Sequence, residues 1–152
     1  MRIYTWTNRL YLNDKQIGLQ SLHVLGEMIA LYANHPFGSQ GHEKFQQVVD
    51  WAANHKTAIF YSGTNSATLR HLWQTIGTAP YPVGIFHEDE DSLDGALTGI
   101  GIILPTRLVE AVQVLLDTGE MPTMWVAGVE VPVVTDPKDE ELVRLCANSR
   151  FA

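Results

Sequence analysis

Cysteine is nearly absent from this sequence, in which Cys146 is the only one. A single thiol cannot close a disulfide within the chain, and it cannot supply the thiolates of a common zinc site. No apolar run reaches the roughly 18 residues that a membrane-spanning helix needs, and the opening residues lack the apolar core of a signal peptide. We therefore expect a cytoplasmic protein without membrane contact, and we predict no metal and no cofactor.

Positive charge is also scarce. The chain has 10 Lys and Arg against 17 Asp and Glu, which gives a formal net charge of −7, and its basic residues are scattered along the sequence. Proteins that follow a nucleic-acid backbone need a basic surface, because neutralisation of phosphates dominates their affinity. Extensive contact with a nucleic-acid backbone is therefore disfavoured, whereas a small nucleotide, or only the tip of a larger nucleic acid, fits this charge.

What the sequence does contain is an alternation of strand and helix patterns. Alternating β-branched and aromatic residues predict a strand over 2–7. Helical spacing predicts a helix over 16–33, which is apolar on most sides and therefore expected to be deeply buried. Its predicted contact face consists of Ile17, Leu22, Leu25, Ile29 and Tyr32.

Local start and stop signals mark the other elements. Asn65 or Thr64 caps one predicted helix that stops at Gly77, and Thr106 caps another that ends at Gly119. The full set comprises helices over 43–54, 64–77, 106–119 and from Pro137 onward, strands over 57–63, 81–88 and 96–105, an acidic loop over 89–95, and a hairpin over 123–136 that turns near Ala127 and Gly128.

This order of elements predicts an α/β fold of three layers, in which a mixed β-sheet carries helices on both faces. No internal repeat and no linker divides the chain. We therefore predict a single domain over 1–152, with a core over 2–105 and a C-terminal extension of helix, hairpin and helix over 106–152.

A polar stripe interrupts the first predicted helix. Gln20, His23 and Glu27 are spaced three and four residues apart, so they share one side of the helix. This stripe is either a surface edge, a core pair satisfied by hydrogen bonds, or the wall of a pocket. In a pocket, His23 could act as a hydrogen-bond partner or general base near pH 7, and Gln20 could orient a carbonyl group or a water.

A second concentration of polar residues lies at 86–94, where acidic side chains follow a predicted strand. A solvated acidic loop is the ordinary interpretation. A divalent cation site is another, although the spacing is not that of an EF-hand. A third makes one of these carboxylates a general base or a partner of His23, because strand ends line ligand crevices in open α/β sheets. Phe86, at the strand end, is a candidate platform for stacking a base.

Two positions could hold a phosphate. The first is the turn from strand to helix over 61–69, where helix amides favour an anion and Arg70 follows one turn later. The other is Arg107, beside Thr106 at the start of a helix. An ordinary capped helix explains the first turn equally well, because Ser, Thr and Asn are the preferred caps.

The residues of 2–105 resemble the type-2 peptidyl-tRNA hydrolase family. In that family a strand leads into a helix with the pattern K-x-x-x-Q-x-x-H, and "QIGLQSLH" places Gln20 and His23 on its Gln and His. Trp51 stands where the family has a tryptophan before its second strand. "GALTGIGIILP" is similar to the family's G-T-x-T strand, with Gly95 and Thr98 matching.

The sequence departs from the family at two functional positions. The family's lysine falls on Gln16, which removes its positive charge, and the family's D-A-G turn has no match, so Glu88 or Asp89 stands in for its aspartate. The resemblance implies a site between the 16–33 helix and the 86–98 segment. In it Gln20 and His23 would position a water and an ester carbonyl, and Thr98 would hold the site.

The function that this resemblance implies is binding, and hydrolysis if the site is active, of an aminoacyl or peptidyl ester at the 3′ end of tRNA. A carboxylate of Glu88 or Asp89 would be the base. Gln16, Phe86, Arg70 and Arg107 are the predicted ligand-binding residues. A non-catalytic protein that sequesters a small nucleotide is the alternative, and there the C-terminal extension could build the interface of a homo-oligomer. A purely structural or protein-interaction domain is a third hypothesis.

Overall fold

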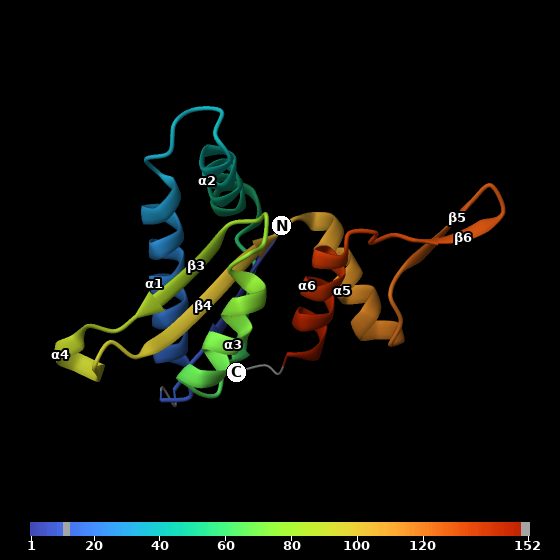
Figure 1. Cartoon of the computed structure of the whole chain (residues 1–152). Helices are drawn as coiled ribbons and strands as arrows, with labels where there is room; N and C mark the ends of the chain where they lie inside the picture. The colour runs from blue at the N-terminus through green and yellow to red at the C-terminus, as the bar shows by residue number, and fades with distance from the viewer. Residues whose placement is uncertain (11–12, 150–152) are drawn as a thin grey trace. The chain divides into compact units, whose positions relative to one another are not determined.

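The first two-thirds of the chain folds around one β-sheet, in which β1 (Arg2–Thr7) is an inner strand. The computed structural model describes residues 1–10 and 13–149. In it, β1 pairs in parallel with β2 (Ala58–Ser62) and antiparallel with β4 (Leu97–Leu104). Strand β3 (Val83–His87) pairs antiparallel with the other side of β4. The sheet is therefore mixed, with the order β2-β1-β4-β3 and with β2 and β3 at its edges (Figure 1).

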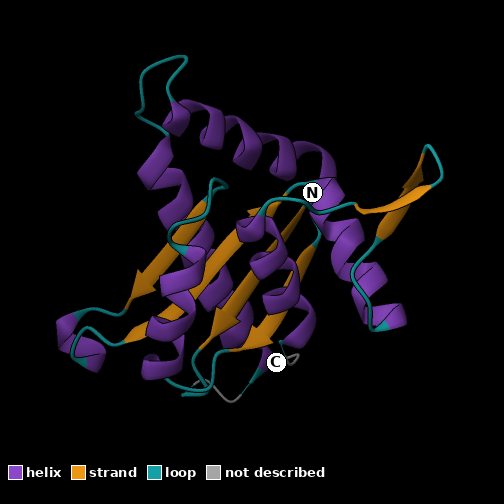
Figure 2. Ribbon diagram, turned by 45° about the vertical axis from the view of Figure 1, so that its right-hand side comes forward, coloured by secondary structure: helices purple, strands orange, loops and turns teal. Residues whose placement is uncertain are grey.

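Helices cover both faces of this sheet, so the predicted three-layer α/β fold is confirmed (Figures 1 and 2). One face carries α1 (Asp14–Tyr32) and α2 (Gln40–Asp50), which runs on into a π-helical turn, η1 (Trp51–His55). The other face carries α3 (Ser66–Ile76), which starts at the predicted cap Asn65 and stops at Gly77.

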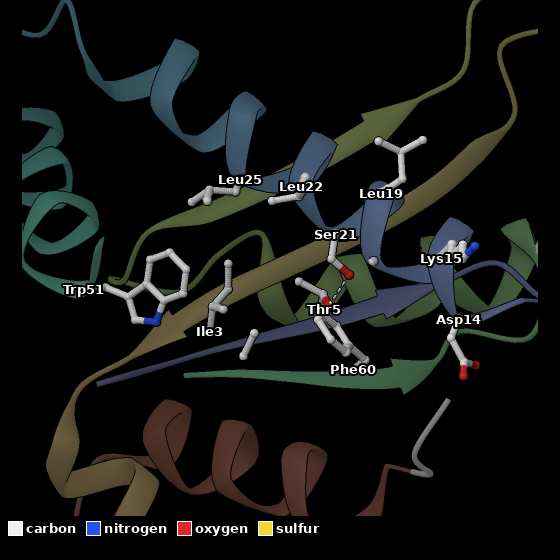
Figure 3. A pocket seen from close by; sticks show the side chains of 12 residues that line it. Ile3, Thr5, Asp14, Lys15, Leu19, Ser21, Leu22, Leu25, Trp51 and Phe60 are labelled. Atoms are coloured by element: carbon white, nitrogen blue, oxygen red, sulfur yellow. Dashed lines mark hydrogen bonds between the residues drawn. The ribbon is translucent and has the colours of Figure 1, made fainter. Parts of the chain in front are cut away.

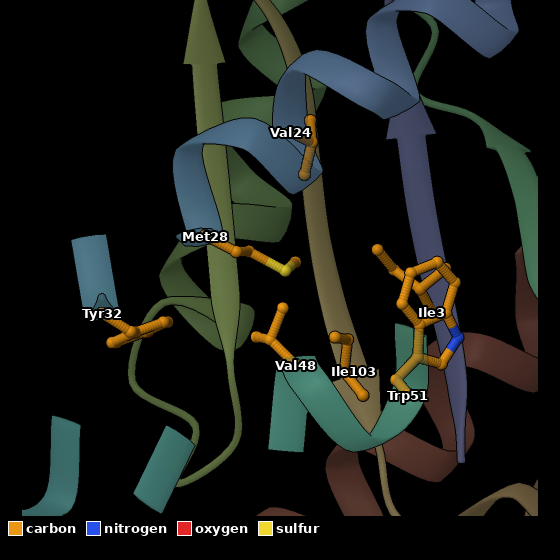
Figure 4. Packing of buried hydrophobic residues seen from close by; sticks show 7 residues of the cluster. All are labelled: Ile3, Val24, Met28, Tyr32, Val48, Trp51 and Ile103. Atoms are coloured by element: carbon orange, nitrogen blue, oxygen red, sulfur yellow. The ribbon is translucent and has the colours of Figure 1, made fainter. Parts of the chain in front are cut away.

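The face under α1 holds an apolar cluster, in which Val24 and Met28 of α1 meet Ile103 of β4 (Figure 4). Glycines let the helix come this close. A Cβ at Gly84 would lie 2.5 Å from the carbonyl oxygen of Val24, and one at Gly99 would lie 2.7 Å from its Cγ2. The cluster consists of Ile3, Val24, Met28, Tyr32, Val48, Trp51 and Ile103.

The opposite face of the sheet is aromatic. Tyr4 stacks on Tyr61 with ring centroids 6.0 Å apart, and Trp6 lies 5.3 Å from the same ring. These side chains are buried, as is Leu69 of α3. Successive residues of β1 point to opposite sides, so Tyr4 and Trp6 share this face while Ile3 and Thr5 point toward α1.

The prediction that α1 is deeply buried is wrong. Leu22 is 63 % exposed and Leu31 is 54 % exposed, whereas the polar Gln20 is only 4 % exposed. Of the predicted contact face, Tyr32 is buried but Ile29 is exposed. The helix rests with one side on the sheet, and the glycines of β3 and β4 select the side that carries Gln20 and Val24, which the apolar pattern alone does not reveal.

Smaller differences concern element ends. The predicted acidic loop contains a short helix, α4 (Glu90–Leu93). The helix α5 (Thr106–Thr118) begins after Pro105 and not after a capping Thr106, because proline holds the extended conformation that precedes a helix. α2 begins at Gln40, earlier than the predicted residue 43, because Ser39 caps it by accepting from the N–H of His42.

By internal contacts the chain divides into two compact units, Met1–Leu104 and Pro105–Ser149. In the second unit α5 contacts α6 (Pro137–Asn148), and the hairpin of β5 (Thr123–Val126) and β6 (Val129–Pro132) lies between them in sequence. The hairpin turns at Ala127 (φ 50°) and Gly128 (φ 83°), as predicted. The expectation of one domain stays a prediction. Over 1–10 and 13–149, no helix is long and apolar enough to cross a membrane.

Candidate functional site

Gln20 of α1 forms the centre of a buried polar network. Its Nε2 donates to Oε1 of Glu88 at 2.8 Å, and its Oε1 accepts from Oγ1 of Thr98 at 3.1 Å. Both ends of the amide are therefore engaged, which fixes its orientation. Glu88 directly follows β3 and Thr98 belongs to β4, so one side chain ties α1 to the ends of two strands.

An aromatic pair lies next to this network. The ring of His23 stacks on the ring of Phe86, with centroids 4.4 Å apart and planes 10° from parallel. His23 follows Gln20 by three residues, so α1 presents both on the same side. His23 is exposed and Phe86 is half-buried. The pair therefore forms a flat aromatic surface that solvent can reach.

The backbone near Phe86 and Glu88 is irregular in a way that positions their side chains. The pairing of β3 with β4 shifts register between Phe86 and His87, and such bulges re-aim side chains at the ends of strands. Both Phe86 and Glu88 contact α1, one through a ring and the other through a hydrogen bond. Gly99 lies beneath them, and a Cβ there would come within 3.9 Å of the Cβ of Phe86.

Asn8 is a buried polar residue at this end of the sheet that sequence reasoning missed. It lies just after β1, its backbone N–H donates to the carbonyl oxygen of Thr98 at 2.9 Å, and its Nδ2 donates to the carbonyl oxygen of Leu97 at 3.3 Å. Ser66 donates to the same carbonyl of Leu97 at 2.9 Å. These bonds hold the start of β4, and with it Thr98. A polar residue directly after a buried strand was the available signal.

Two other predicted site residues, Gln16 and Asp89, lie at the starts of helices. Gln16 is exposed, and it is part of the cap of α1: its N–H donates to Oδ1 of Asn13, and its Oε1 accepts from Nδ2 of Asn13. Asp89 is exposed and immediately precedes α4. Glu88 is thus the carboxylate of the acidic segment whose bond to Gln20 joins it to the network.

The two predicted phosphate ligands do not join Gln20. Arg70 is exposed on α3, on the face of the sheet opposite α1. The N-terminus of α3 is capped within the protein, because Asn65 accepts from the N–H of Thr68. Arg107 belongs to the second unit, where its guanidinium donates to the buried Asp139 at 2.6 Å.

Burial shifts the pKa values of Cys146 and Lys44. Burial raises the pKa of the Cys146 thiol, which keeps it protonated and unreactive. Burial lowers the pKa of Lys44, whose ammonium donates to the carbonyl oxygen of Ala79 and lies 5.6 Å from the centre of the Tyr32 ring. Among the residues that the structure describes, no three His, Cys, Asp or Glu side chains are grouped to hold a metal ion.

The structure therefore brings together Gln20, His23, Phe86, Glu88 and Thr98 from three elements separated by up to 78 positions. The arrangement offers one carboxylate held by an amide, one exposed imidazole and one aromatic face. These are the groups needed for acid–base chemistry beside a stacked ring. No family model matches the chain, and no curated protein is similar to it.

Proposed function

We propose that the chain binds the acylated 3′ end of a tRNA and hydrolyses its ester, in the manner of a type-2 peptidyl-tRNA hydrolase. The observation that carries this proposal is the buried Gln20, which holds Glu88 and Thr98 beside the stacked pair of the exposed His23 and the half-buried Phe86. The resemblance in sequence points to the same residues, and the order of elements over 2–105 agrees with it.

Recognition would rest on the aromatic pair. Every nucleobase has a flat face, so stacking on an exposed ring tolerates any base. Single-stranded ends, with their bases unstacked, are the parts of an RNA that proteins read in this way. A contact limited to the terminal nucleotide also suits a chain with a net charge of −7, because few phosphates need to approach it.

The chemistry would rest on Glu88. Its carboxylate takes a proton from a water, whose oxygen attacks the carbonyl carbon of the ester. The imidazole N–H of His23 donates to the oxyanion that forms. A donor is needed here because the family's lysine is replaced by Gln16 in this chain. When the C–O bond breaks, the proton passes from Glu88 to the departing ribose oxygen. Gln20 is a positioning residue in this scheme, because its Nε2 fixes one oxygen of the carboxylate.

The test is the release of the acyl group from aminoacyl-tRNA and peptidyl-tRNA. Glu88→Gln is expected to slow hydrolysis by about 100-fold or more, the range for loss of a general base. The matched control is Glu90→Gln, because Glu90 is an exposed carboxylate two residues away in α4. His23→Ala is compared in the same way with His71→Ala on α3. Equal activity in Glu88→Gln and Glu90→Gln would rule out the proposed base.

Gln16 favours a second candidate, a protein that binds a small nucleotide without reaction. The residue brings no positive charge to the site, and its amide is already bonded to Asn13. Such a protein would still stack a base on His23 and Phe86. Incubation with a panel of free and cyclic nucleotides, followed by denaturation, should then return one of them intact, and Phe86→Ala should lose it. A protein that consumes aminoacyl-tRNA and retains no nucleotide contradicts this candidate.

A further inference from the structure

A cavity of about 570 Å³ lies on the other side of α1, above β1 and the edge strand β2 (Figure 3). It is separate from the network of Gln20, none of whose members line it. Pockets that enclose small molecules commonly measure about 300–1,000 Å³. The wall consists of Ile3, Thr5, Asp14, Lys15, Gly18, Leu19, Ser21, Leu22, Leu25, Trp51, Ala58 and Phe60.

The polar side chains of Thr5, Ser21 and Trp51 in the wall are bonded within the protein. Nε1 of Trp51 donates to the carbonyl oxygen of Thr57 at 3.0 Å. The hydroxyls of Thr5 and Ser21 lie 2.8 Å apart, and Ser21 also donates to the carbonyl oxygen of Ile17. The interior therefore presents apolar surface to an occupant. A peptide backbone inside it would leave its own N–H and C=O groups without partners, which is costly.

Charge is confined to one end of the cavity. Lys15 and Asp14 lie at the end opposite Trp51 (Figure 3). Among the described residues of the wall, Lys15 is the only cation, and it stands in the first turn of α1, where the helix dipole also favours an anion. The cavity thus has an apolar body and one charged end, where the ammonium of Lys15 and the helix N-terminus favour an anion and the carboxylate of Asp14 opposes it.

The cavity is open to solvent along α1. Leu19 is 51 % exposed beside it, and Gly18 leaves its side free, since a Cβ there would meet nothing within 4 Å. A ligand can therefore enter between α1 and β2 without displacing a packed side chain. Exposed apolar residues that line a hollow are typical of ligand-binding grooves.

We propose that this cavity binds an amphipathic carboxylate, a straight alkyl chain that ends in a carboxyl group. The chain lies along the apolar wall toward Trp51, and the carboxylate faces the ammonium of Lys15. The alkyl chain of such a ligand matches the apolar wall near Trp51, and its carboxylate matches the ammonium of Lys15. The ligand needs no hydrogen bond from the interior of the cavity.

Dodecanoate is the probe, titrated into the full-length protein by calorimetry below its micelle concentration. Dodecanoate should bind more tightly than dodecanol, and dodecyltrimethylammonium should bind least. Lys15→Gln should weaken dodecanoate about threefold, the range for an exposed ion pair, and leave dodecanol unchanged. Equal binding of the carboxylate and the ammonium compound would overturn the proposed polarity.

A steric test uses two glycines of the same helix. Gly18→Leu places a side chain in the cavity mouth, whereas Gly26→Leu adds the same side chain to α1 away from the cavity wall. Both changes favour the helix, so both variants should fold. Gly18→Leu should weaken dodecanoate at least tenfold and Gly26→Leu should not.

Sedimentation of the ligand-free protein completes the test. If the chain self-associates and Gly18→Leu makes it monomeric, the occupant of the cavity is a second copy and the proposal fails. It also fails if both glycine variants bind dodecanoate like the wild type.

Discussion

The two flanks of α1 differ in how closely they approach the sheet. Toward β3 and β4 the helix is in contact, because Gly84 and Gly99 bring no side chain between the strands and Val24. Toward β1 and β2 a hollow of about 570 Å³ remains, since Thr5 and Phe60 carry side chains there. The difference shows that residue size in the strands sets the position of the helix. It gives one flank a fixed polar network and the other an open cavity.

Gly84→Ala should disturb the flank of α1 that contacts β3 and β4, and it has the largest effect that we expect. A Cβ there would lie 2.5 Å from the carbonyl oxygen of Val24 and 2.8 Å from Cγ of Met28. Backbone must move to make room, so Gly84→Ala should lower the free energy of unfolding by about 3 kcal/mol. Urea titration followed by circular dichroism measures this change.

Gly26→Ala is the matched control on the same helix, where the new methyl meets nothing within 4 Å. Alanine is the better helix former, so this variant should gain about 0.5–1 kcal/mol. A similar loss in both variants would show that Gly84 does not set the distance between α1 and β3.

The face that α1 buries is the part of the fold that the sequence did not predict. Local signals were enough elsewhere: Asn65 and Gly77 mark the ends of α3, and Ala127 with Gly128 marks the hairpin turn. The side of α1 that faces the sheet depends instead on glycines roughly 60 to 75 positions further along. Because α1 has apolar residues all round, its own pattern favours no side.

A substitution at Gln20 tests the polar network on the flank of α1 that contacts β3 and β4. Gln20→Ala removes the acceptor of Oγ1 of the buried Thr98 and the bond from Gln20 to Glu88. An unmet buried polar group costs about 1–3 kcal/mol, so we expect a loss of about 2 kcal/mol in urea unfolding. In the Gln20→Ala variant, Thr98→Val should lower the free energy of unfolding by less than it does in the wild type, because the two residues share one hydrogen bond. Strict additivity would mean that the bond contributes little.

Sequence reasoning found most of this network and could not find its geometry. Gln20 and His23 stood out as polar residues on an apolar helix, and Glu88 and Phe86 stood out at a strand end. That Gln20 bonds Glu88, 68 positions away, depends on how α1 lies over β3. The predicted phosphate ligand Arg70 does not join the network for the same reason, since α3, which carries it, covers the opposite face of the sheet.

Ser21 makes a hydrogen bond of the same kind on the flank of α1 that faces the cavity. Its hydroxyl lies 2.8 Å from that of Thr5, and both residues line the cavity. In Ser21→Ala, water can enter the hollow and replace the lost partner. We therefore expect a loss of about 0.5 kcal/mol, well below that of Gln20→Ala. A loss as large as that of Gln20→Ala would indicate that the cavity excludes water.

Leu22 gives the smallest expected effect, because its side chain is 63 % exposed at the rim of the cavity. Leu22→Gln removes little buried apolar area, and an exposed substitution of this kind changes stability by less than about 0.5 kcal/mol. Urea unfolding should therefore superimpose on the wild type. A loss of about 2 kcal/mol or more, the size expected when a buried leucine is lost, would mean that this leucine is covered in solution. The flank of α1 over β1 and β2 would then be closed by another surface, and the contrast between the two flanks would not hold.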